Sequence, residues 1–146
     1  MKKVLLYLNV VAILLSCGRR SNGTESNNPQ YEAQPNHIEV LYFYGQKRCV
    51  TCRAIETNTV GLLDSLYSSE IKEGKITFRT IDISKKENKK ANKYEVSWSS
   101  LILNMHKDGS ETVDDLTSFG FSSARNHPQE FKDSLRRKID NLMERL

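Results

Sequence analysis

The sequence is poor in cysteine, with three in 146 residues. Cys49 and Cys52 stand two residues apart, and Cys17 stands alone near the N-terminus. A small domain held together by disulfide bonds needs more cysteines than this for its length. The count therefore excludes a disulfide framework and leaves one CxxC pair, a spacing typical of redox chemistry or of half a metal site.

A strong charge of one sign is also missing. The formal net charge is +4, and it falls to +2 once Lys2 and Lys3 of the N-terminal segment are set aside. Basic residues elsewhere are mixed with acidic ones, as they are between Lys132 and Asp140, which is typical of a solvated helix face. A balance this weak excludes the basic footprint of a nucleic-acid-binding domain, so we expect no nucleic-acid partner.

Apolar runs long enough to span a membrane are lacking too. The run Val4–Leu15, interrupted only by Asn9, has 12 residues, and at about 1.5 Å per residue it cannot cross a hydrocarbon core of ~30 Å. Behind the positive charges of Lys2 and Lys3, a run of this length is typical of a signal peptide. The sequence therefore predicts a signal peptide over residues 1–16.

The end of this run resembles the bacterial lipobox, in the sequence Leu14-Leu15-Ser16-Cys17. The resemblance implies that the Cys17 thiol is acylated with diacylglycerol and becomes the new N-terminus after cleavage. Two or three acyl chains anchor a protein stably where one is marginal. We therefore expect a lipoprotein of the bacterial cell envelope, with its domain facing the periplasm or the exterior. The alternative is a signal peptide cut elsewhere, which would leave an odd thiol outside the cytoplasm.

The next segment, residues 18–36, is rich in Ser, Asn, Gly, Gln and Pro and shows no apolar period. Such a composition buries too little apolar surface to offset the entropy lost on ordering. The sequence therefore predicts a lipidated flexible tether over residues 17–36, followed by one folded domain over residues 37–146.

The folded domain should begin with a buried strand. Ile38–Tyr44 is β-branched and aromatic with almost no polar alternation, so both of its faces should be covered. From Val50 onward the apolar period becomes helical, and the apolar face of this helix should hold Ala54, Ile55, Leu62, Leu63 and Leu66.

Strands and helices alternate after this helix. Ile76–Ile83 reads as a second strand, and Ser84 with Glu87 fits a capping box that starts a short helix over residues 85–94. A strand, a turn, an edge strand and a last helix with proline in its first turn complete the chain; they occupy Leu101–Met105, Lys107–Ser110, Glu111–Leu116 and Asn126–Leu146. This order predicts an α/β fold, with a mixed four-stranded sheet and helices on both faces.

The order of elements, with CxxC after the first strand, resembles the thioredoxin fold over the whole predicted domain. Later segments match the thioredoxin series in the same order, namely Ile81-Asp82-Ile83, Lys93-Tyr94-Glu95-Val96, Leu101-Ile102-Leu103 and Lys107-Asp108-Gly109. The resemblance implies a thioredoxin-like protein with a redox-active disulfide. The stretch Tyr42–Glu56 is also similar to a small bacterial family labelled nitrophenyl compound nitroreductase subunit, ArsF type.

Three positions depart from the thioredoxin pattern. Thioredoxins carry a buried aspartate six residues before the first cysteine, where this sequence has Phe43. They carry a cis-proline before the third strand, where a gap-free match places Ser100 and the alternative is Ser99. The tryptophan before their motif is replaced by Arg48. The missing aspartate leaves Cys52 without an obvious base, so its activation should rely on solvent.

The chemistry of the pair follows from its place at the start of a helix. Unsatisfied N–H groups and the helix dipole stabilise a thiolate there, and the thiolate is the species that attacks a disulfide. We therefore expect Cys49 to be the nucleophile and Cys52 to resolve the mixed disulfide. Cations close in sequence should lower the pKa of the Cys49 thiol further, and they are Lys47, Arg48 and Arg53.

These residues predict a membrane-tethered thiol–disulfide oxidoreductase or electron relay. Its partners should be protein thiols or disulfides, and its domain should be monomeric and need no cofactor. The backbone near Ser100 should orient the partner. Tyr94 and Trp98 should pack in the core or at its rim, or Trp98 should line a groove for an extended partner. The direction of electron flow stays open.

Other interpretations of the CxxC pair use the same residues. A permanent disulfide would close so short a loop that it adds little stability. A zinc site needs four ligands, and His37, His106 and His127 are isolated in the sequence, so we expect no metal site. The main alternative is a non-catalytic subunit that binds a protein or a thiophilic ion such as Cu(I) or arsenite, for example in a nitroreductase or arsenic-related system.

Overall fold

The computed structural model describes residues 36–85 and 88–146. The predicted signal peptide, the lipidation site Cys17 and the tether up to residue 35 lie outside the described residues. Within the described ranges, none of the helices combines the length and the apolar character that a membrane span requires.

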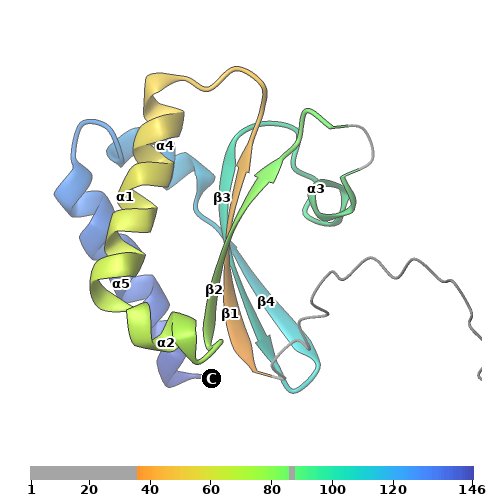
Figure 1. Cartoon of the computed structure of the whole chain (residues 1–146), viewed down its shortest axis with the longest axis vertical. Helices are drawn as coiled ribbons and strands as arrows, with labels where there is room; N and C mark the ends of the chain where they lie inside the picture. The colour runs from red at the N-terminus through yellow and green to blue at the C-terminus, as the bar shows by residue number, and fades with distance from the viewer. Residues whose placement is uncertain (1–35, 86–87) are drawn as a thin grey trace, which may run out of the picture. The chain divides into compact units, whose positions relative to one another are not determined.

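A mixed four-stranded sheet lies at the centre of the domain, with the strand order β2-β1-β3-β4 (Figure 1). The first strand, β1 (His37–Tyr44), pairs in parallel with β2 (Ile76–Asp82). On its other side β1 pairs antiparallel with β3 (Ser100–Lys107), which continues into β4 (Ser110–Asp115) as a hairpin. The predicted α/β architecture, the mixed four-stranded sheet and the order of its strands and main helices are confirmed.

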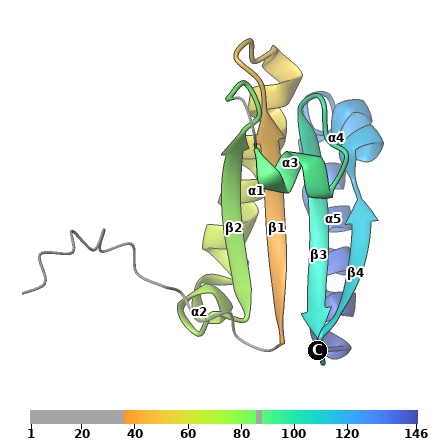
Figure 2. The ribbon, with the colours of Figure 1, turned by 90° about the vertical axis from the view of Figure 1, so that its right-hand side faces the viewer.

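Helices cover both faces of this sheet. On one face lie α1 and α5 with the shorter α2 and α4, and on the other face lies α3 (Figures 1 and 2). The bounds of these helices are Val50–Leu66 (α1), Ser68–Lys72 (α2), Lys89–Lys93 (α3), Thr117–Ser123 (α4) and Pro128–Glu144 (α5). Parallel pairing of β1 with β2 requires a crossover, and α1 with α2 supplies it.

Strand β1 divides the core because its side chains alternate between the two faces. Val40 and Tyr42 belong to the larger cluster, together with residues of α1 and α5 such as Ile55 and Leu135. Leu41 and Phe43 belong to the smaller cluster beneath α3, with Ala91, Ile102 and the partly buried Tyr94. Every residue from His37 to Phe43 is buried, as the absence of polar alternation predicted.

The hairpin between β3 and β4 confirms the predicted turn. Asp108 and Gly109 both have positive φ, 50° and 77°, and Lys107 pairs with Ser110 across the turn. Two consecutive residues with positive φ make the turn whose twist matches that of the flanking strands.

The helix predicted over residues 85–94 begins later than expected. It starts at Lys89, and its N-cap is Asn88, whose side chain accepts hydrogen bonds from the N–H groups of Lys90 and Ala91 at 3.1 and 3.2 Å. The predicted capping residue Ser84 instead donates its hydroxyl to the Asp82 carboxylate at 2.6 Å. A local bond to the preceding aspartate therefore replaces the expected cap.

Two short helices were not predicted, and one residue of α1 was assigned to the wrong face. Leu66, the last residue of α1, is 48% exposed, since the helix ends there and Tyr67 takes the buried position. Helix α4 buries Thr117, Gly120 and Ser123, small and polar residues that form no apolar period. Gly120 permits its close approach to α1, because a Cβ there would lie 3.2 Å from Cδ1 of Ile55.

Candidate active site at the start of helix α1

The CxxC pair occupies the first turn of α1, immediately after the loop that follows β1. Cys49 is the N-cap residue, with extended backbone angles of −71° and 169°. Its sulfur accepts a hydrogen bond from the backbone N–H of Cys52 at 3.0 Å. Its carbonyl oxygen accepts the N–H of Arg53 at 3.1 Å, which starts the helical hydrogen-bond ladder. The Cys49 sulfur thus lies where the N–H groups of the helix converge.

The two cysteines form a disulfide bond, with their Cα atoms 5.0 Å apart. Cys49 is exposed, whereas Cys52 is 5% exposed and belongs to the core. Cys49 is therefore the member of the pair that is open to solvent. The division between Cys49 as nucleophile and Cys52 as resolving residue stays a prediction.

Tyr42, and not Phe43, lies against Cys52. The Tyr42 hydroxyl donates a hydrogen bond to the Cys52 carbonyl oxygen at 2.7 Å, in a fully buried position. Phe43 points to the opposite face of the sheet, where its ring contacts that of Tyr94 edge-on at 6.0 Å between centroids. Phe43, six residues before Cys49, is therefore turned away from the pair, and Tyr42 is the residue of β1 that contacts Cys52.

The Tyr42 hydroxyl is held in its neutral form. Burial raises the pKa of Tyr42, and the negative charge of Glu56 raises it further. The charge of Arg48 and the nearby Ser99 side chain lower the pKa of Tyr42, but they do not outweigh burial and Glu56. The group next to Cys52 is thus a neutral phenol that donates a hydrogen bond, and it cannot act as the carboxylate base of a thioredoxin.

The two serines proposed for the cis-proline position lie in different places. Ser100 is buried, pairs with Phe43 across the sheet, and donates its hydroxyl to the Trp98 carbonyl at 3.2 Å. Ser99 is the one whose side chain reaches Tyr42. The described residues include no cis peptide bond. Of the two alternatives, Ser99 is therefore the one connected to the cysteine pair, and the role predicted for the backbone near Ser100 stays a prediction.

The three cations predicted to assist Cys49 differ in what they contact. Arg48 forms a short ion pair with Glu56 and also stacks on the ring of Tyr44, with 3.5 Å from its guanidinium carbon to the ring centroid. Its charge is therefore largely balanced by Glu56. Lys47 and Arg53 are exposed.

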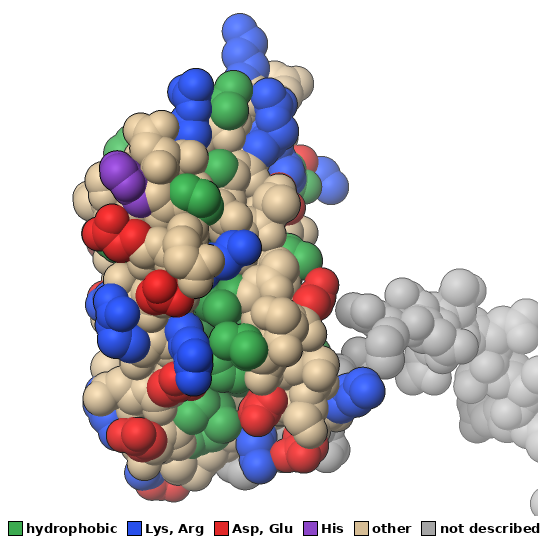
Figure 3. All heavy atoms as spheres, turned by 90° about the vertical axis from the view of Figure 1, so that its left-hand side faces the viewer, with side chains coloured by type: hydrophobic (Ala, Val, Ile, Leu, Met, Phe, Trp, Pro, Cys, Tyr) green, Lys and Arg blue, Asp and Glu red, His purple; other side chains and the backbone are tan. Residues whose placement is uncertain are grey.

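Figure 3 shows Lys and Arg side chains gathered at the end of the domain where β1 passes into α1. The partial positive charge at the N-terminus of α1 lies at this same end. The site is therefore electropositive even though Arg48 is paired, and this environment favours a thiolate at Cys49.

Two large apolar side chains are exposed, one between the cysteines and one just before β3. Val50, between the two cysteines, is 54% exposed, and Trp98 is 61% exposed. Trp98 stacks on Phe121 of α4, with centroids 5.5 Å apart and an interplanar angle of 11°. Trp98 is therefore not part of the core, and its use in a groove for an extended partner stays a prediction.

Sequence reasoning missed Tyr42 and Glu56 as parts of this site, and Phe121 as the ring on which Trp98 stacks. The alternation of β1 was a usable signal for Tyr42, because Ile38, Val40 and Tyr42 share one face. The pairing of Arg48 with Glu56 joins a loop to the second turn of a helix, and no sequence spacing indicates it. Phe121 lies on α4, which has no apolar period of its own.

Comparison with known proteins gives similarity to solved structures only. No protein-family model matches the sequence, and no curated protein matches it. A thioredoxin of Fasciola hepatica is 22% identical over 72% of this chain and 80% of that one, with a TM-score of 0.46. Thioredoxin-2, described as a component of malaria parasite protein secretion machinery, is 26% identical over 55% of this chain and 70% of its own, with a TM-score of 0.39. A structure described as a malarial protein is 24% identical over 56% and 83%, with a TM-score of 0.40.

Proposed function

We propose that this protein is a thiol–disulfide oxidoreductase or electron relay that uses Cys49 and Cys52, tethered to the bacterial cell envelope by a lipid on Cys17. The observation that carries the redox proposal is the disulfide at the start of α1, with an exposed sulfur at Cys49 and a buried one at Cys52. A purely structural disulfide needs no such exposure, and the disulfide of this pair closes too short a loop to stabilise the fold much.

In the reductive direction, the Cys49 thiolate attacks one sulfur of a partner's disulfide. A bond forms between Cys49 and that sulfur, the partner's own bond breaks, and the released thiolate takes a proton from water. Cys52, as a thiolate, then attacks the sulfur of Cys49, which reforms the pair's disulfide and releases the second partner thiol. The partner gains two electrons and two protons, which the dithiol loses. The oxidative direction is the reverse of these steps.

The first half of this cycle is well supported by local structure. The N–H of Cys52 lies 3.0 Å from the Cys49 sulfur, so the same contact stabilises a thiolate that attacks or leaves. In the second half, Tyr42 holds the Cys52 backbone in place while offering no base. Proton removal from Cys52 therefore falls to solvent or to the partner.

Trapping tests the proposal directly. With Cys52→Ala, the mixed disulfide on Cys49 is not resolved, so covalent complexes should accumulate and should disappear on reduction. Cys49→Ala is the matched control and should trap nothing. The complexes are measured by non-reducing electrophoresis and mass spectrometry of the full chain expressed in a bacterial host. If Cys49 of the Cys52→Ala variant is alkylated readily but no mixed disulfide forms, the redox proposal is wrong.

The membrane tether is a separate proposal with its own test. It rests on the lipobox-like sequence before Cys17 and on the tether composition of residues 17–36. Mass spectrometry should find the mature N-terminus at an acylated Cys17, and Cys17→Ser should move the protein out of the membrane fraction. A membrane-bound protein with an unmodified Cys17 would contradict this proposal and leave the redox proposal untouched.

A second candidate function is a non-catalytic subunit that binds a protein partner or a thiophilic ion on the thiols. The replacement of a buried carboxylate by the neutral Tyr42 next to Cys52 favours it. The reduction potential of the pair discriminates between the two. A value of about −270 mV indicates a reductant and one of about −120 mV an oxidant, provided that the protein also exchanges with insulin disulfides. No exchange at any potential supports the binding subunit.

A further inference from the structure

Two exposed cations flank Cys49, one in the loop before α1 and one in its first turn. Lys47 precedes Cys49 by two residues, and Arg53 follows it by four. Neither side chain forms a hydrogen bond or an ion pair with any residue in the ranges 36–85 and 88–146. The backbone N–H of Arg53 donates to the Cys49 carbonyl at 3.1 Å, so the two residues are one helical turn apart and share one side of α1.

Two acidic side chains that lie near this loop are already matched by other cations. Glu56 forms its ion pair with Arg48. The negative charge of Asp82, at the end of β2, is offset by Lys85 and by Arg48. The two cations that flank the exposed cysteine therefore keep their full charge, and the partial positive charge at the N-terminus of α1 adds to it.

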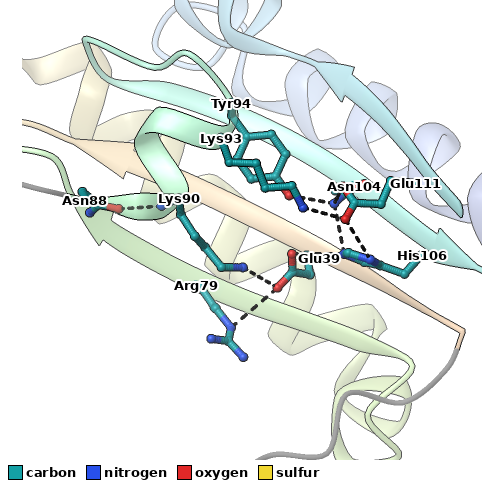
Figure 4. A network of polar contacts seen from close by, with 9 residues as sticks. All are labelled: Glu39, Arg79, Asn88, Lys90, Lys93, Tyr94, Asn104, His106 and Glu111. Carbon is teal, nitrogen blue, oxygen red and sulfur yellow. Dashed lines mark hydrogen bonds and ion pairs between the residues drawn. The ribbon is translucent and has the colours of Figure 1, made fainter. Parts of the chain in front are cut away.

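The cations on the side of the sheet that α3 covers provide a contrast (Figure 4). There Lys90 lies 2.6 Å and Arg79 3.9 Å from one carboxylate oxygen of Glu39, and Lys93 lies 2.5 Å from Glu111. Charges paired in this way largely cancel at a distance, so they exert little attraction on a partner. At the exposed sulfur of Cys49, by contrast, an approaching partner meets positive charge that is not cancelled.

We propose that the partner of this site is a protein whose reactive disulfide or thiol lies in an acidic segment. The inference rests on the proposed redox function of Cys49, and it names the class of substrate that the site selects. A carboxylate beside the partner's sulfur is attracted by Lys47 and Arg53 as that sulfur approaches Cys49, whereas a lysine there is repelled. Because these charges are exposed, they act mainly on the rate of encounter, and salt weakens them.

Selection of a partner differs from the effect that the same cations have on the thiol. A larger thiolate fraction at Cys49 raises the rate of exchange with every partner by the same factor. Attraction of carboxylates changes the ratio of the rates for partners of opposite charge. That ratio is independent of the thiolate fraction, so it reports on selection alone.

Exchange with peptides of different charge tests the proposal. Three peptides share one internal disulfide and differ only in the residues beside its cysteines, which are aspartate, serine or lysine. The full chain carrying Cys17→Ser, in a nonionic detergent, is reduced and freed of reductant, and its dithiol then gives two electrons and two protons to each peptide disulfide. Acid quenching and chromatography measure the peptide thiols. Each rate constant is divided by that for dithiothreitol, a neutral dithiol, because flanking charges alter the intrinsic reactivity of a disulfide.

The aspartate peptide should react about 10-fold faster than the lysine peptide at low ionic strength, with the serine peptide between them. In ~1 M salt, where the Debye length is about 3 Å, the three rate constants should converge. Lys47→Gln and Arg53→Gln should each bring the ratio of the aspartate rate to the lysine rate closer to one. The combined charge reversal, Lys47→Glu with Arg53→Glu, should make the lysine peptide the faster substrate.

The control changes the net charge by the same amount away from the cysteines. Lys72→Glu with Arg137→Glu alters two exposed cations on α2 and α5 and should keep the ratio of the parent chain, and circular dichroism shows whether each variant folds. Equal rate constants for the three peptides, or a preference that survives the reversal at Lys47 and Arg53, would overturn this inference alone, as would a preference lost equally in the control. No exchange with any peptide would overturn the proposed redox function as well.

Discussion

The hydroxyl of Tyr42 donates a hydrogen bond to the backbone carbonyl of Cys52 at 2.7 Å, and neither residue is accessible enough to exchange this bond for one to water. This contact joins the central strand β1 to the first turn of α1, where the exposed sulfur of Cys49 lies. The position of the cysteine pair relative to the sheet therefore depends on a phenol that the sequence does not mark as functional.

Tyr42→Phe should destabilise the protein by about 0.5–1.5 kcal/mol, since it removes one buried hydrogen bond and keeps the ring. It should also lengthen the lifetime of the mixed disulfide on Cys49, because Cys52 loses a contact that positions it. Urea denaturation and stopped-flow exchange measure the two effects. Tyr44→Phe, two residues along the same face, is the control, because the ring that stacks under Arg48 is retained. Equal effects in both variants would refute the positioning role.

Glu56→Gln should lower the pKa of the Cys49 thiol in the reduced protein. The substitution removes the negative charge that balances Arg48, so the positive charge near the N-terminus of α1 is felt more strongly by a thiolate. Arg48→Gln should shift the pKa in the opposite direction. The rate of alkylation by iodoacetamide as a function of pH measures both. Glu130→Gln, an exposed change in the first turn of α5, should leave the profile unchanged.

Glu39 should make the stability of the protein sensitive to acid. Burial raises the pKa of this carboxyl, but the hydrogen bond and charge of Lys90 together with His106 outweigh burial, and the net pKa lies below its ordinary value of 4.5. The unfolded chain therefore takes up the proton first as pH falls. The stabilisation is present above about pH 4.5 and is lost as pH falls through the lowered pKa of the folded state.

Glu39→Gln should accordingly make the free energy of unfolding fall less steeply as pH drops below 4.5. Near neutral pH it should lower the free energy of unfolding by about 1–3 kcal/mol, because the charged partners of Glu39 lose their hydrogen bonds to the carboxylate. Chemical denaturation across this pH range measures the slope. The control is Glu73→Gln, because Glu73 also has a lowered pKa through its bond with Lys75 but lies on the surface. A slope that persists in Glu39→Gln would contradict the assignment.

Two glycines in helices should respond to alanine with opposite signs. At Gly120 a Cβ would meet the buried Ile55 side chain at 3.2 Å, so Gly120→Ala should destabilise the protein by about 1–3 kcal/mol. At the exposed Gly61, nothing lies within 4 Å, so Gly61→Ala should stabilise it by about 0.5–1 kcal/mol through helix propensity. Thermal denaturation compares the two, and a gain in stability at Gly120 would show that α4 does not pack tightly on α1.

Local patterns in the sequence were enough to predict the order of the main elements and the place of the cysteine pair. Periods of two and 3.6 residues, a Gly at the hairpin turn and a Pro at the start of α5 are local signals, and each describes a segment of a few turns or one strand. The predicted start of α3 was wrong because the Ser84 hydroxyl bonds to the nearby Asp82 carboxylate and does not cap the helix.

The surroundings of the reactive groups, by contrast, depend on how the elements pack against one another. Tyr42, and not Phe43, contacts Cys52 because neighbouring residues of β1 face opposite sides of the sheet and Tyr42 is on the side that α1 covers. Glu56 of α1 largely balances the charge of Arg48, which lies in the loop before this helix. The ring of His37 on β1 stacks on that of His106 on β3. Each of these is a contact between separate elements that forms when their apolar faces pack. Local periodicity predicts the apolar faces, but it does not say which polar side chains the packing brings together.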